Sequence, residues 1–274
     1  MLPHQLAERI PRKLIWAFRE FLPAIPVPIT LPHRIIWTAT FPDGLDIWVV
    51  GVEKDDRRFV ERTVGPGMTV LDLGAHHGLY TTLLSRLVGP EGRVIAFEPS
   101  PRERRGLERH LRLNGCNNVT VVPCAVGERS GTAEFFMANS RRSGASGMRN
   151  TELDGRFADS VRIEVPVTTI DEYLEEHHIE GVDFVKMDIE GAELAALRGG
   201  RDLLTADRRP TIMIEMSDTV TRGWGYDCKE KYDELTKLGY YWYSILSDGS
   251  LIPSPRKDHY EGFPNLVAKP AARI

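Results

Sequence analysis

A glycine-containing loop that begins with an acidic residue is the first chemically informative segment of the chain. The loop, Asp72-Leu73-Gly74-Ala75-His76-His77-Gly78, follows an apolar run and precedes a helical pattern. Glycines let a ligand approach the backbone closely, and a helix amino-terminus offers free N–H groups to an anion such as a carboxylate. The spacing G-x-x-x-G differs from the G-x-G-x-x-G fingerprint of dinucleotide sites, and Asp72 would repel a pyrophosphate but attract an ammonium group. The loop therefore favours S-adenosylmethionine over a nicotinamide dinucleotide.

A second acidic residue, Glu98, ends the next apolar run, 26 residues after Asp72. An acid at the end of the second strand of such a sheet can accept hydrogen bonds from both ribose hydroxyls of a nucleoside cofactor. The alternative is a solvated strand terminus, and the neighbouring glycine loop favours the ribose role. The third run ends at Cys124-Ala125-Val126-Gly127, where small residues such as Ala125 leave room for an adenine.

Charged residues are densest in the segment Lys186-Met187-Asp188-Ile189-Glu190-Gly191-Ala192-Glu193. Lys186 and Asp188 are two residues apart, so they project from the same face of a strand. Charges at the end of a buried strand are costly unless they are paired or functional, and strand ends face the ligand crevice of an open sheet. Glu193 fits the simple preference of carboxylates for a helix start. Asp188 and Glu190 are candidates for the site.

A further acid, Glu215, ends the apolar run that begins at Pro210, so Asp188, Glu190 and Glu215 could converge. They could orient and deprotonate a hydroxyl, pair with Lys186, or hold a divalent cation through oxygen ligands, and the sequence does not choose among these alternatives. His76 and His77 also invite a metal interpretation, but adjacent residues on a tight turn rarely converge on one ion.

These residues need a frame that brings several strand ends to one edge. From about residue 56, short apolar strands alternate with helical stretches, which is the pattern of a parallel sheet with crossover helices. We expect strands at 69–73, 94–98, 119–123, 183–188 and 211–215, and helices near 78–88, 101–114, 170–178, 191–205 and 228–238. Capping boxes at 100–103 and 169–172 begin two of these helices. A final hairpin over 239–252 turns at Ser247-Asp248-Gly249.

The first 55 residues follow a different pattern. Apolar residues recur at i+4 over 5–22 and predict an amphipathic helix, which either covers its own domain or contacts a membrane surface or partner. A β-hairpin follows, with strands at 35–41 and 46–52 around Pro42-Asp43-Gly44. We therefore expect an extension over 1–55 and a larger domain over 56–274.

The segment 137–160 interrupts the alternation of strands and helices with small, polar and basic residues. A long loop inside a compact domain is often a lid or binding loop. A mobile surface insertion has the same composition, so both interpretations stay open.

Composition excludes several classes of protein. The formal net charge of -4 gives no basic excess for nucleic acid. The three cysteines are odd in number and form no Cys-x-x-Cys pair, which favours reduced thiols. The apolar stretch 14–31 contains Arg19, Glu20 and three prolines, so it does not predict a transmembrane or signal segment. We expect a soluble, unprocessed, cytoplasmic protein.

Taken together, these motifs resemble the FkbM family of S-adenosylmethionine-dependent methyltransferases. The resemblance covers roughly residues 56–245, and it is carried by the segments 72–81, Phe97-Glu98-Pro99, 186–193 and 210–215. It implies a class I methyltransferase fold: a doubly wound α/β, Rossmann-like sheet of seven mostly parallel strands with a reversed final strand. It adds Tyr80, Thr81, Pro99 and Asp188 to the cofactor contacts. The family usually has asparagine where this chain has His76, which leaves the contact at that position open.

The resemblance also implies O-methylation of a sugar, glycolipid or natural-product hydroxyl. Catalysis would consist mainly of aligning the hydroxyl oxygen with the methyl carbon, because a sulfonium is already a good leaving group. Asp188 is the candidate nearest the acceptor, with Glu190 or Glu215 in support and Lys186 beside them. Arginines of the 137–160 loop could clamp an anionic acceptor; they are Arg141, Arg142, Arg149 and Arg156. The alternatives are a catalytically silent module that binds S-adenosylmethionine and an NAD-dependent dehydrogenase.

Overall fold

The computed structural model describes residues 25–41, 53–138, 146–148 and 160–271. The chain divides into two compact units, Met1–Lys54 and Asp55–Ile274, and each is described by itself. The predicted helix over 5–22 and the four arginines of the 137–160 loop lie outside the described residues.

The smaller unit contains a two-stranded antiparallel sheet. Strand β1 (Ile25–Leu31) pairs with β2 (Ile35–Phe41) around a short 3-10 turn, η1 (Pro32–Arg34). The strand predicted at 35–41 is therefore confirmed, but its described partner precedes it in the chain. The predicted turn at 42–44 and the strand at 46–52 lie outside the described residues. The upstream strand was missed because Pro23, Pro26 and Pro28 argue against regular pairing.

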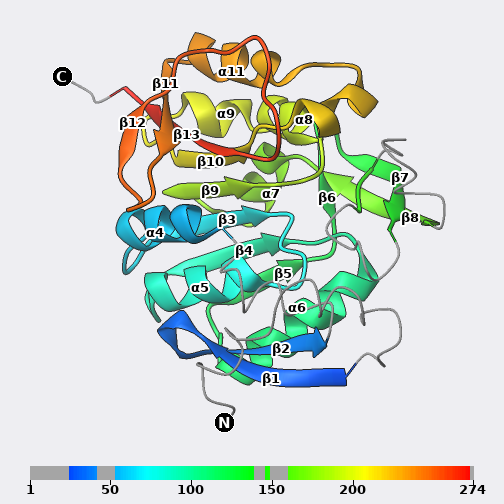
Figure 1. Ribbon diagram of the computed structural model, residues 1–274. Coiled ribbons are helices and arrows are strands. Elements are labelled where there is room, and N and C mark those ends of the chain that lie inside the picture. The colour runs from blue at the N-terminus through cyan, green and yellow to red at the C-terminus, as the bar shows by residue number, and fades with distance from the viewer. Residues whose placement is uncertain (1–24, 42–52, 139–145, 149–159, 272–274) are drawn as a thin grey trace, which may run out of the picture. The chain divides into compact units, whose positions relative to one another are not determined.

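The larger unit is built on an eight-stranded sheet (Figure 1) with the order β12-β11-β13-β10-β9-β3-β4-β5. Its strands are β3 (Thr69–Leu73), β4 (Arg93–Phe97), β5 (Val119–Val122), β9 (Phe184–Met187), β10 (Thr211–Glu215), β11 (Tyr240–Ile245), β12 (Leu251–Pro253) and β13 (Asn265–Pro270). The five strands from β10 to β5 are parallel, and β13 runs antiparallel to β10. Seven strands thus form the predicted sheet with its reversed final strand. The eighth, β12, is the second arm of the predicted 239–252 hairpin.

Helices connect the parallel strands as the alternation of patterns predicts. The predicted ones are α5 (Leu79–Val88), α6 (Pro101–Asn114), α7 (Ile170–Glu176), α8 (Glu193–Arg198), α9 (Arg201–Thr205) and α11 (Cys228–Lys237). Three elements were not predicted: α4 (Lys54–Thr63), which precedes β3, α10 (Asp218–Thr221) and the 3-10 turn η3 (Arg222–Trp224). Thr169 caps α7 by accepting a hydrogen bond from the Glu172 amide, as its capping box predicts. Ser100 precedes α6, but its hydroxyl bonds the Glu103 carboxylate instead of a backbone N–H group.

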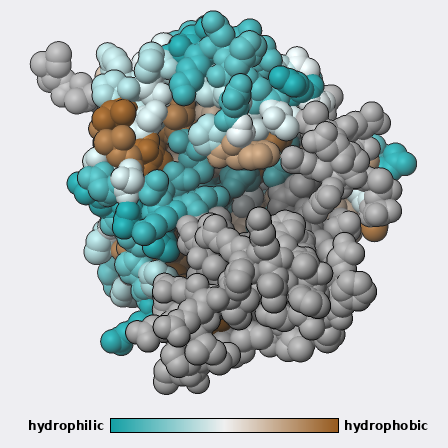
Figure 2. All heavy atoms as spheres, in the orientation of Figure 1, coloured by the Kyte–Doolittle hydropathy of each residue, from teal (hydrophilic) through white to brown (hydrophobic). Residues whose placement is uncertain are grey.

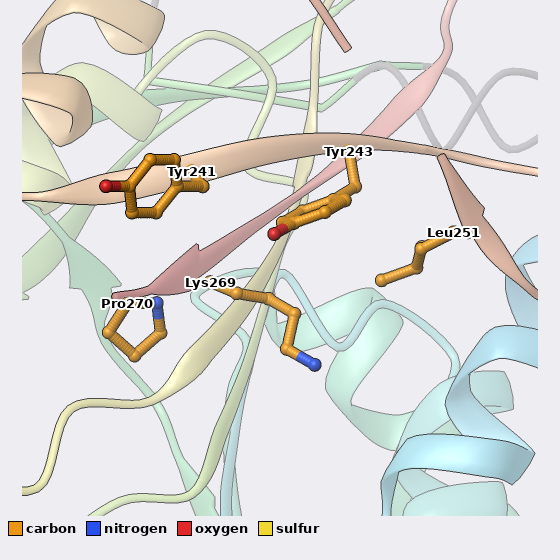
Figure 3. A pocket seen from close by; sticks show the side chains of 5 residues that line it. All are labelled: Tyr241, Tyr243, Leu251, Lys269 and Pro270. Atoms are coloured by element: carbon orange, nitrogen blue, oxygen red, sulfur yellow. The ribbon is translucent and has the colours of Figure 1, made fainter. Parts of the chain in front are cut away.

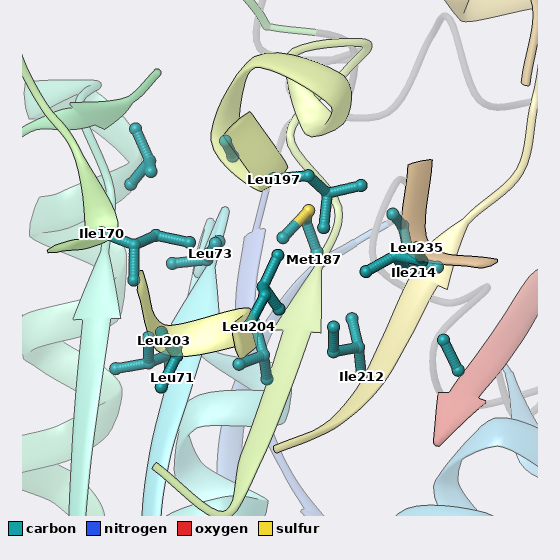
Figure 4. Packing of buried hydrophobic residues seen from close by; sticks show 14 of the residues in the cluster. Leu71, Leu73, Ile170, Met187, Leu197, Leu203, Leu204, Ile212, Ile214 and Leu235 are labelled. Atoms are coloured by element: carbon teal, nitrogen blue, oxygen red, sulfur yellow. The ribbon is translucent and has the colours of Figure 1, made fainter. Parts of the chain in front are cut away.

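Alternate residues of the parallel strands face opposite layers of helices. Leu71, Leu73 and Met187 join the large core, where residues of α7, α8, α9 and α11 cover them (Figure 4). Ala96 faces the other side and packs with Leu107 and Leu111 of α6. Asp72 and Lys186 belong to the second set by register, because strand side chains alternate between the two faces. The pleat therefore places both charged groups on the α5 and α6 side of the sheet.

The single helix predicted over 191–205 is wrong, because the chain forms α8 and α9 with a break at Gly199 and Gly200. A Cβ atom on Gly199 would lie 2.1 Å from the Gly127 carbonyl oxygen, and one on Gly200 would lie 2.9 Å from Ile170 Cδ1. The break thus lets the chain pass close to its neighbours, which helix periodicity does not reveal.

Around the segment predicted as a loop, the chain forms a separate three-stranded sheet, β6-β8-β7. Its strands are β6 (Ala125–Val126), β7 (Gly131–Met137) and β8 (Val161–Thr168), and the three lie together beside the main sheet (Figure 1). Gly147 pairs with Phe136 through two backbone hydrogen bonds of 2.8 and 3.1 Å. The described part of the insertion is therefore anchored to β7.

Exposed apolar side chains gather at the β11–β12 edge of the sheet (Figure 2), where Tyr241, Leu246 and Ile252 are all more than a third exposed. None of the helices among the described residues is both long and apolar enough to cross a membrane.

Candidate active site

The glycine loop after β3 is held by backbone packing against two neighbouring segments. Gly74 has a φ of 82°, and a Cβ atom there would lie 1.9 Å from the Asp188 carbonyl oxygen. Gly78 has a φ of 87°, and its Cβ would lie 2.5 Å from Leu107 Cδ1 on α6. The amides of Gly74 and Ala75 both donate to the Phe97 carbonyl oxygen at the end of β4. The glycines are thus needed for the loop to reach its neighbours, independently of any ligand.

Asp72 is fully buried on the α5 side of β3 and is only partly satisfied. Thr81 Oγ1 donates to Asp72 Oδ2 over 2.6 Å, whereas Oδ1 has no hydrogen-bond partner within the described part of the chain. Burial raises the pKa of Asp72, and the nearby Lys186 ammonium opposes that rise. A buried acceptor without a donor is costly, so the end of β3 fits a ligand that brings a cationic donor.

Glu98 connects the glycine loop to the start of α6. Its two carboxylate oxygens accept hydrogen bonds from the His76 and Ser100 amides, each over 2.8 Å. Burial raises the pKa of Glu98 to about 7, although both amide bonds favour the ionised form. A carboxylate has about four acceptor positions, so two amides leave capacity for two more donors. Glu98 is therefore a buried acid that can accept hydrogen bonds from two hydroxyl groups. The carbonyl oxygen of its neighbour, Pro99, accepts a hydrogen bond from Arg104.

His76 and His77 stack, with ring centroids 4.1 Å apart. Burial lowers the pKa of His76 to about 4 and that of His77 to about 3, so both rings are neutral at pH 7. His76 has a φ of 50°, a conformation that asparagine and histidine adopt more readily than most side chains.

The two adjacent histidines, which were not expected to bind one ion together, have ring nitrogens that lie close to one another and to Glu103. In the described part of the chain, His76, His77 and Glu103 bring their ligand atoms within 4.8 Å of one another, whereas the expected carboxylates form no such group. However, Glu103 already pairs with the Arg102 guanidinium over 2.6 Å and with the Ser100 hydroxyl. The geometry gives no support to a cation held by Asp188, Glu190 and Glu215.

Lys186 connects the end of β3 to the end of β9. Its Cα is paired in register with that of Asp72, and its ammonium lies 3.2 Å from Asp188 Oδ2. The same ammonium lies 5.0 Å from the centre of the Tyr80 ring on α5. Lys186 is only 4% exposed at its side chain and Asp188 is 32% exposed, so the lysine is buried while the aspartate faces out.

Glu190 and Gly191 form a turn that a later segment of the chain holds in place. Glu190 has a φ of 52° and Gly191 a φ of 94°, both left-handed. Trp224 Nε1 donates to the Glu190 carbonyl oxygen over 3.0 Å, and the Tyr226 hydroxyl donates to the Gly191 carbonyl oxygen over 2.7 Å. The Asp188 amide also donates to the Leu73 carbonyl oxygen, which ties this turn to the glycine loop.

Glu193 is more than the helix-start carboxylate that the sequence suggests. It is completely buried and accepts hydrogen bonds from the Ile189 and Gly191 amides over 3.0 and 3.1 Å. Lys231 Nζ lies 3.2 Å from its second carboxylate oxygen. Glu193 therefore stabilises the turn from its buried side.

Lys231 was missed by the sequence analysis and is the most buried cation near the site. Its ammonium donates to the Glu215 carbonyl oxygen over 2.6 Å in addition to pairing with Glu193. Burial alone would lower the pKa of Lys231, but its anionic neighbours, Glu193 first, raise it. Cys228, three residues before Lys231 on α11, is also buried, so a polar residue on an apolar helix face was the available signal.

Glu215 ends β10 beside this ion pair. Burial, followed by the charges of Asp188 and Glu193, raises the pKa of Glu215 to about 9. A raised pKa favours the neutral carboxylic acid, and that form can donate a hydrogen bond.

Two other features lie outside this cluster. Ala125, predicted near the adenine, is buried with Phe135 and Val165 in the core of the three-stranded sheet. A surface groove (Figure 3) is lined by Tyr241, Tyr243, Leu251, Lys269 and Pro270 at the far edge of the main sheet, and it contains none of the predicted site residues.

Comparison with known proteins decides the family. The model of the methyltransferase FkbM domain matches residues 72–241, which is more than half of the chain. The chain therefore belongs to the FkbM family of S-adenosylmethionine-dependent methyltransferases. The predicted family and cofactor are confirmed, and the dehydrogenase alternative is set aside. The main sheet has the mostly parallel strands and the reversed final strand of the predicted class I methyltransferase fold.

Two curated relatives are similar to this chain. Methyltransferase sdnD of Sordaria araneosa is 28% identical in an alignment 154 positions long that covers 47% of this chain and 59% of that protein. The 2-O-methyltransferase NoeI of Sinorhizobium fredii is 25% identical in an alignment 178 positions long that covers 60% of this chain and 70% of that protein. The chain thus spans about three fifths of the length of the first relative. Among solved structures, Aeropyrum pernix fibrillarin with bound S-adenosylmethionine has 17% identity and a TM-score of 0.42, covering 75% of this chain and 67% of its own.

Proposed function

We propose that this chain transfers a methyl group from S-adenosylmethionine to a hydroxyl oxygen of a sugar, glycolipid or natural-product acceptor. The observation that carries the proposal is the unsatisfied, buried Asp72 Oδ1 at one strand end, next to the Lys186–Asp188 pair at another. The Asp72 oxygen fits a cationic group of the cofactor, and the Lys186–Asp188 pair fits a hydroxyl of the acceptor. The 2-O-methyltransferase activity named for NoeI supports oxygen as the methylated atom.

The cofactor would be held by the loop after β3 and the end of β4. Asp72 Oδ1 would accept from the ammonium of the methionine moiety, and Glu98 would accept from the two ribose hydroxyls. Residues 74–78, Tyr80, Thr81 and Pro99 would line the cofactor. S-adenosylmethionine supplies an electrophilic methyl group bound to a sulfonium, which leaves as a neutral thioether.

The acceptor would lie at the end of β9. Asp188 would accept a hydrogen bond from the acceptor hydroxyl, orient its oxygen and take its proton as the new C–O bond forms. Lys186 holds that carboxylate in place through the 3.2 Å ion pair. Glu215, as a neutral acid, would support the acceptor as a hydrogen-bond donor, and Glu190 would border it. Most of the rate gain would come from alignment of the two reactants.

Calorimetry with S-adenosylmethionine and a screen of labelled-methyl transfer over hydroxylated sugars, lipids and polyketides test this function together. Wild-type protein should bind the cofactor, and Glu98→Ala should bind it more weakly. Transfer of label to one of the acceptor classes is the expected result. Absence of binding heat would contradict the cofactor site, and binding without transfer to any acceptor would favour the silent-module alternative.

Three further parts of the proposal concern the 137–160 loop, the domain that holds the activity, and the cellular compartment. Arg141, Arg142, Arg149 and Arg156 would clamp an anionic acceptor such as a phosphorylated sugar, and replacing them should raise the apparent KM for that acceptor. We assign the activity to residues 56–274. All three cysteines are free thiols, which supports the cytoplasm as the expected compartment.

A further inference from the structure

The segment that runs from α10 to the start of α11, residues 218–228, crosses the turn at Glu190 and Gly191; it is called the strap below. Asp218 anchors the strap at one end, since its carboxylate accepts bonds from the Cys228 and Tyr260 amides, each over 2.8 Å. Thr221 and Cys228 are also within sulfur hydrogen-bonding distance of each other, at 3.8 Å. The strap is therefore fixed to itself and to the segment before β13, independently of the turn that it covers.

From this anchored strap, two aromatic side chains reach the turn. Trp224 and Tyr226 donate to two consecutive carbonyl oxygens, those of Glu190 and Gly191. Contact is close, because a Cβ atom on Gly191 would lie 2.4 Å from the Trp224 ring. The Tyr226 hydroxyl is also 3.4 Å from Glu193 Oε2.

On the inner side of the same turn, Glu193 accepts from two amides and Lys231 neutralises its charge. Two carbonyl groups and two amide groups of residues 189–191 are thus bonded to side chains. A left-handed conformation at a residue other than glycine is unfavourable, and it persists only where the surroundings impose it. Glu190, at a φ of 52°, is in that situation, and both the strap and Glu193 hold the backbone around it.

We propose that Trp224, Tyr226 and Lys231 are positioning residues, which fix the turn after β9 so that Asp188 and Glu190 meet the acceptor in one geometry. This inference rests on the proposed function for its link to catalysis. Trp224 and Tyr226 act through the backbone carbonyl groups of residues 190 and 191, and Lys231 acts through the Glu193 carboxylate and the Glu215 carbonyl oxygen.

Tyr226→Phe is the sharpest test, because it removes one hydroxyl and leaves the ring and the ion pair in place. Tyr232→Phe is the matched control, since its hydroxyl donates to the Ser254 carbonyl oxygen on the far side of α11. Amide hydrogen exchange at Ile189 and Gly191 should become about fivefold faster in Tyr226→Phe, as expected for one lost hydrogen bond. It should stay unchanged in Tyr232→Phe. Trp224→Phe should show the same local increase as Tyr226→Phe.

Kinetics then separates positioning from folding. With the acceptor that the labelled-methyl screen identifies, Tyr226→Phe should lower kcat about tenfold or more, while the calorimetric affinity for S-adenosylmethionine stays within about twofold of wild type. Unchanged exchange at 189–191 would overturn the proposal, and so would faster exchange with an unchanged kcat. If wild-type protein transfers no methyl group, the proposed function fails, and the exchange comparison still decides whether the strap fixes the turn.

Discussion

The ends of β3 and β4 differ from the end of β9 in how their charges are satisfied. At the first, Asp72 has a buried oxygen without a donor in the described residues, and Glu98 holds two backbone amides with capacity to spare. At the second, Asp188 pairs with Lys186, and Glu193 is bonded to two amides and a lysine. Among the described residues, the first region keeps a buried acceptor without a donor, whereas Asp188 and Glu193 of the second region are paired with lysines.

This difference suggests that the ends of β3 and β4 bind the cofactor and that the end of β9 aligns the acceptor. A cofactor that must be exchanged at each turnover needs a site whose polar groups gain partners when it binds. An acceptor that reacts needs groups that are already in position, since alignment provides most of the rate. Changes in the first region should therefore alter affinity, and changes in the second should alter stability and rate.

Lys231→Met has the largest expected effect, because it leaves Glu193 buried without its cation. Removal of one partner from a buried ion pair typically costs about 3–5 kcal/mol in the free energy of unfolding. Urea unfolding measures this loss. Arg256→Met, which breaks the half-exposed pair with Asp233, is the control and should cost less than about 1 kcal/mol. Equal losses in the two variants would show that the buried network does not support the second region.

Asp72→Asn should weaken binding of S-adenosylmethionine by about 10- to 100-fold, the range for one charge-assisted hydrogen bond. Because burial raises the pKa of Asp72, the ionised form is costly in the folded state, and the variant should melt at the same or a higher temperature. Calorimetry and thermal unfolding measure the two quantities. Asp171→Asn, a carboxylate that caps α9, should leave the cofactor affinity unchanged. A wild-type affinity in Asp72→Asn would remove Asp72 from the cofactor site.

The affinity for S-adenosylmethionine should rise with pH through the pKa of Glu98, which burial raises to about 7. Ribose hydroxyls donate, so they favour the ionised carboxylate, and the affinity should increase about tenfold between pH 6 and pH 8. Glu98→Gln should flatten this dependence. A wild-type affinity that falls or stays constant over this range would contradict the ribose role.

The smallest effect concerns acid stability. The folded-state pKa of His77, about 3, lies below the unfolded value of 6.5, so the folded state binds fewer protons. The stability contribution is therefore fully present above pH 6.5 and is lost as the pH falls toward 3. His77→Gln should narrow the difference in melting temperature between pH 7 and about pH 4.5 by a few degrees. If the difference in melting temperature is unaltered in His77→Gln, groups other than His77 cause the acid sensitivity.

The sequence predicted the parallel sheet well because each strand and helix has a strong local pattern. The strands at 69–73 and 211–215 and the helix at 101–114 have the bounds that were expected. Asp72, Glu98 and Asp188 could be placed near one edge because parallel strands end on the same side. These inferences need only periodicity, capping signals and topology.

Features that depend on distant contacts could not be predicted. Lys231 is 38 residues from Glu193, and Trp224 is 34 residues from Glu190, so no local pattern connects them. The break at Gly199 depends on Gly127, and the convergence of His76 with His77 depends on a left-handed backbone. Each of these is a consequence of close packing, which a single sequence does not encode locally.

The most direct test of the central claim compares labelled-methyl transfer by wild-type protein and Asp188→Asn, with S-adenosylmethionine affinity measured on the same samples. The account predicts that Asp188→Asn binds the cofactor within about threefold of wild type and transfers methyl at least about 100-fold more slowly, since it loses its hydrogen-bond acceptor and base. Undiminished transfer by Asp188→Asn would contradict the placement of the acceptor at the end of β9.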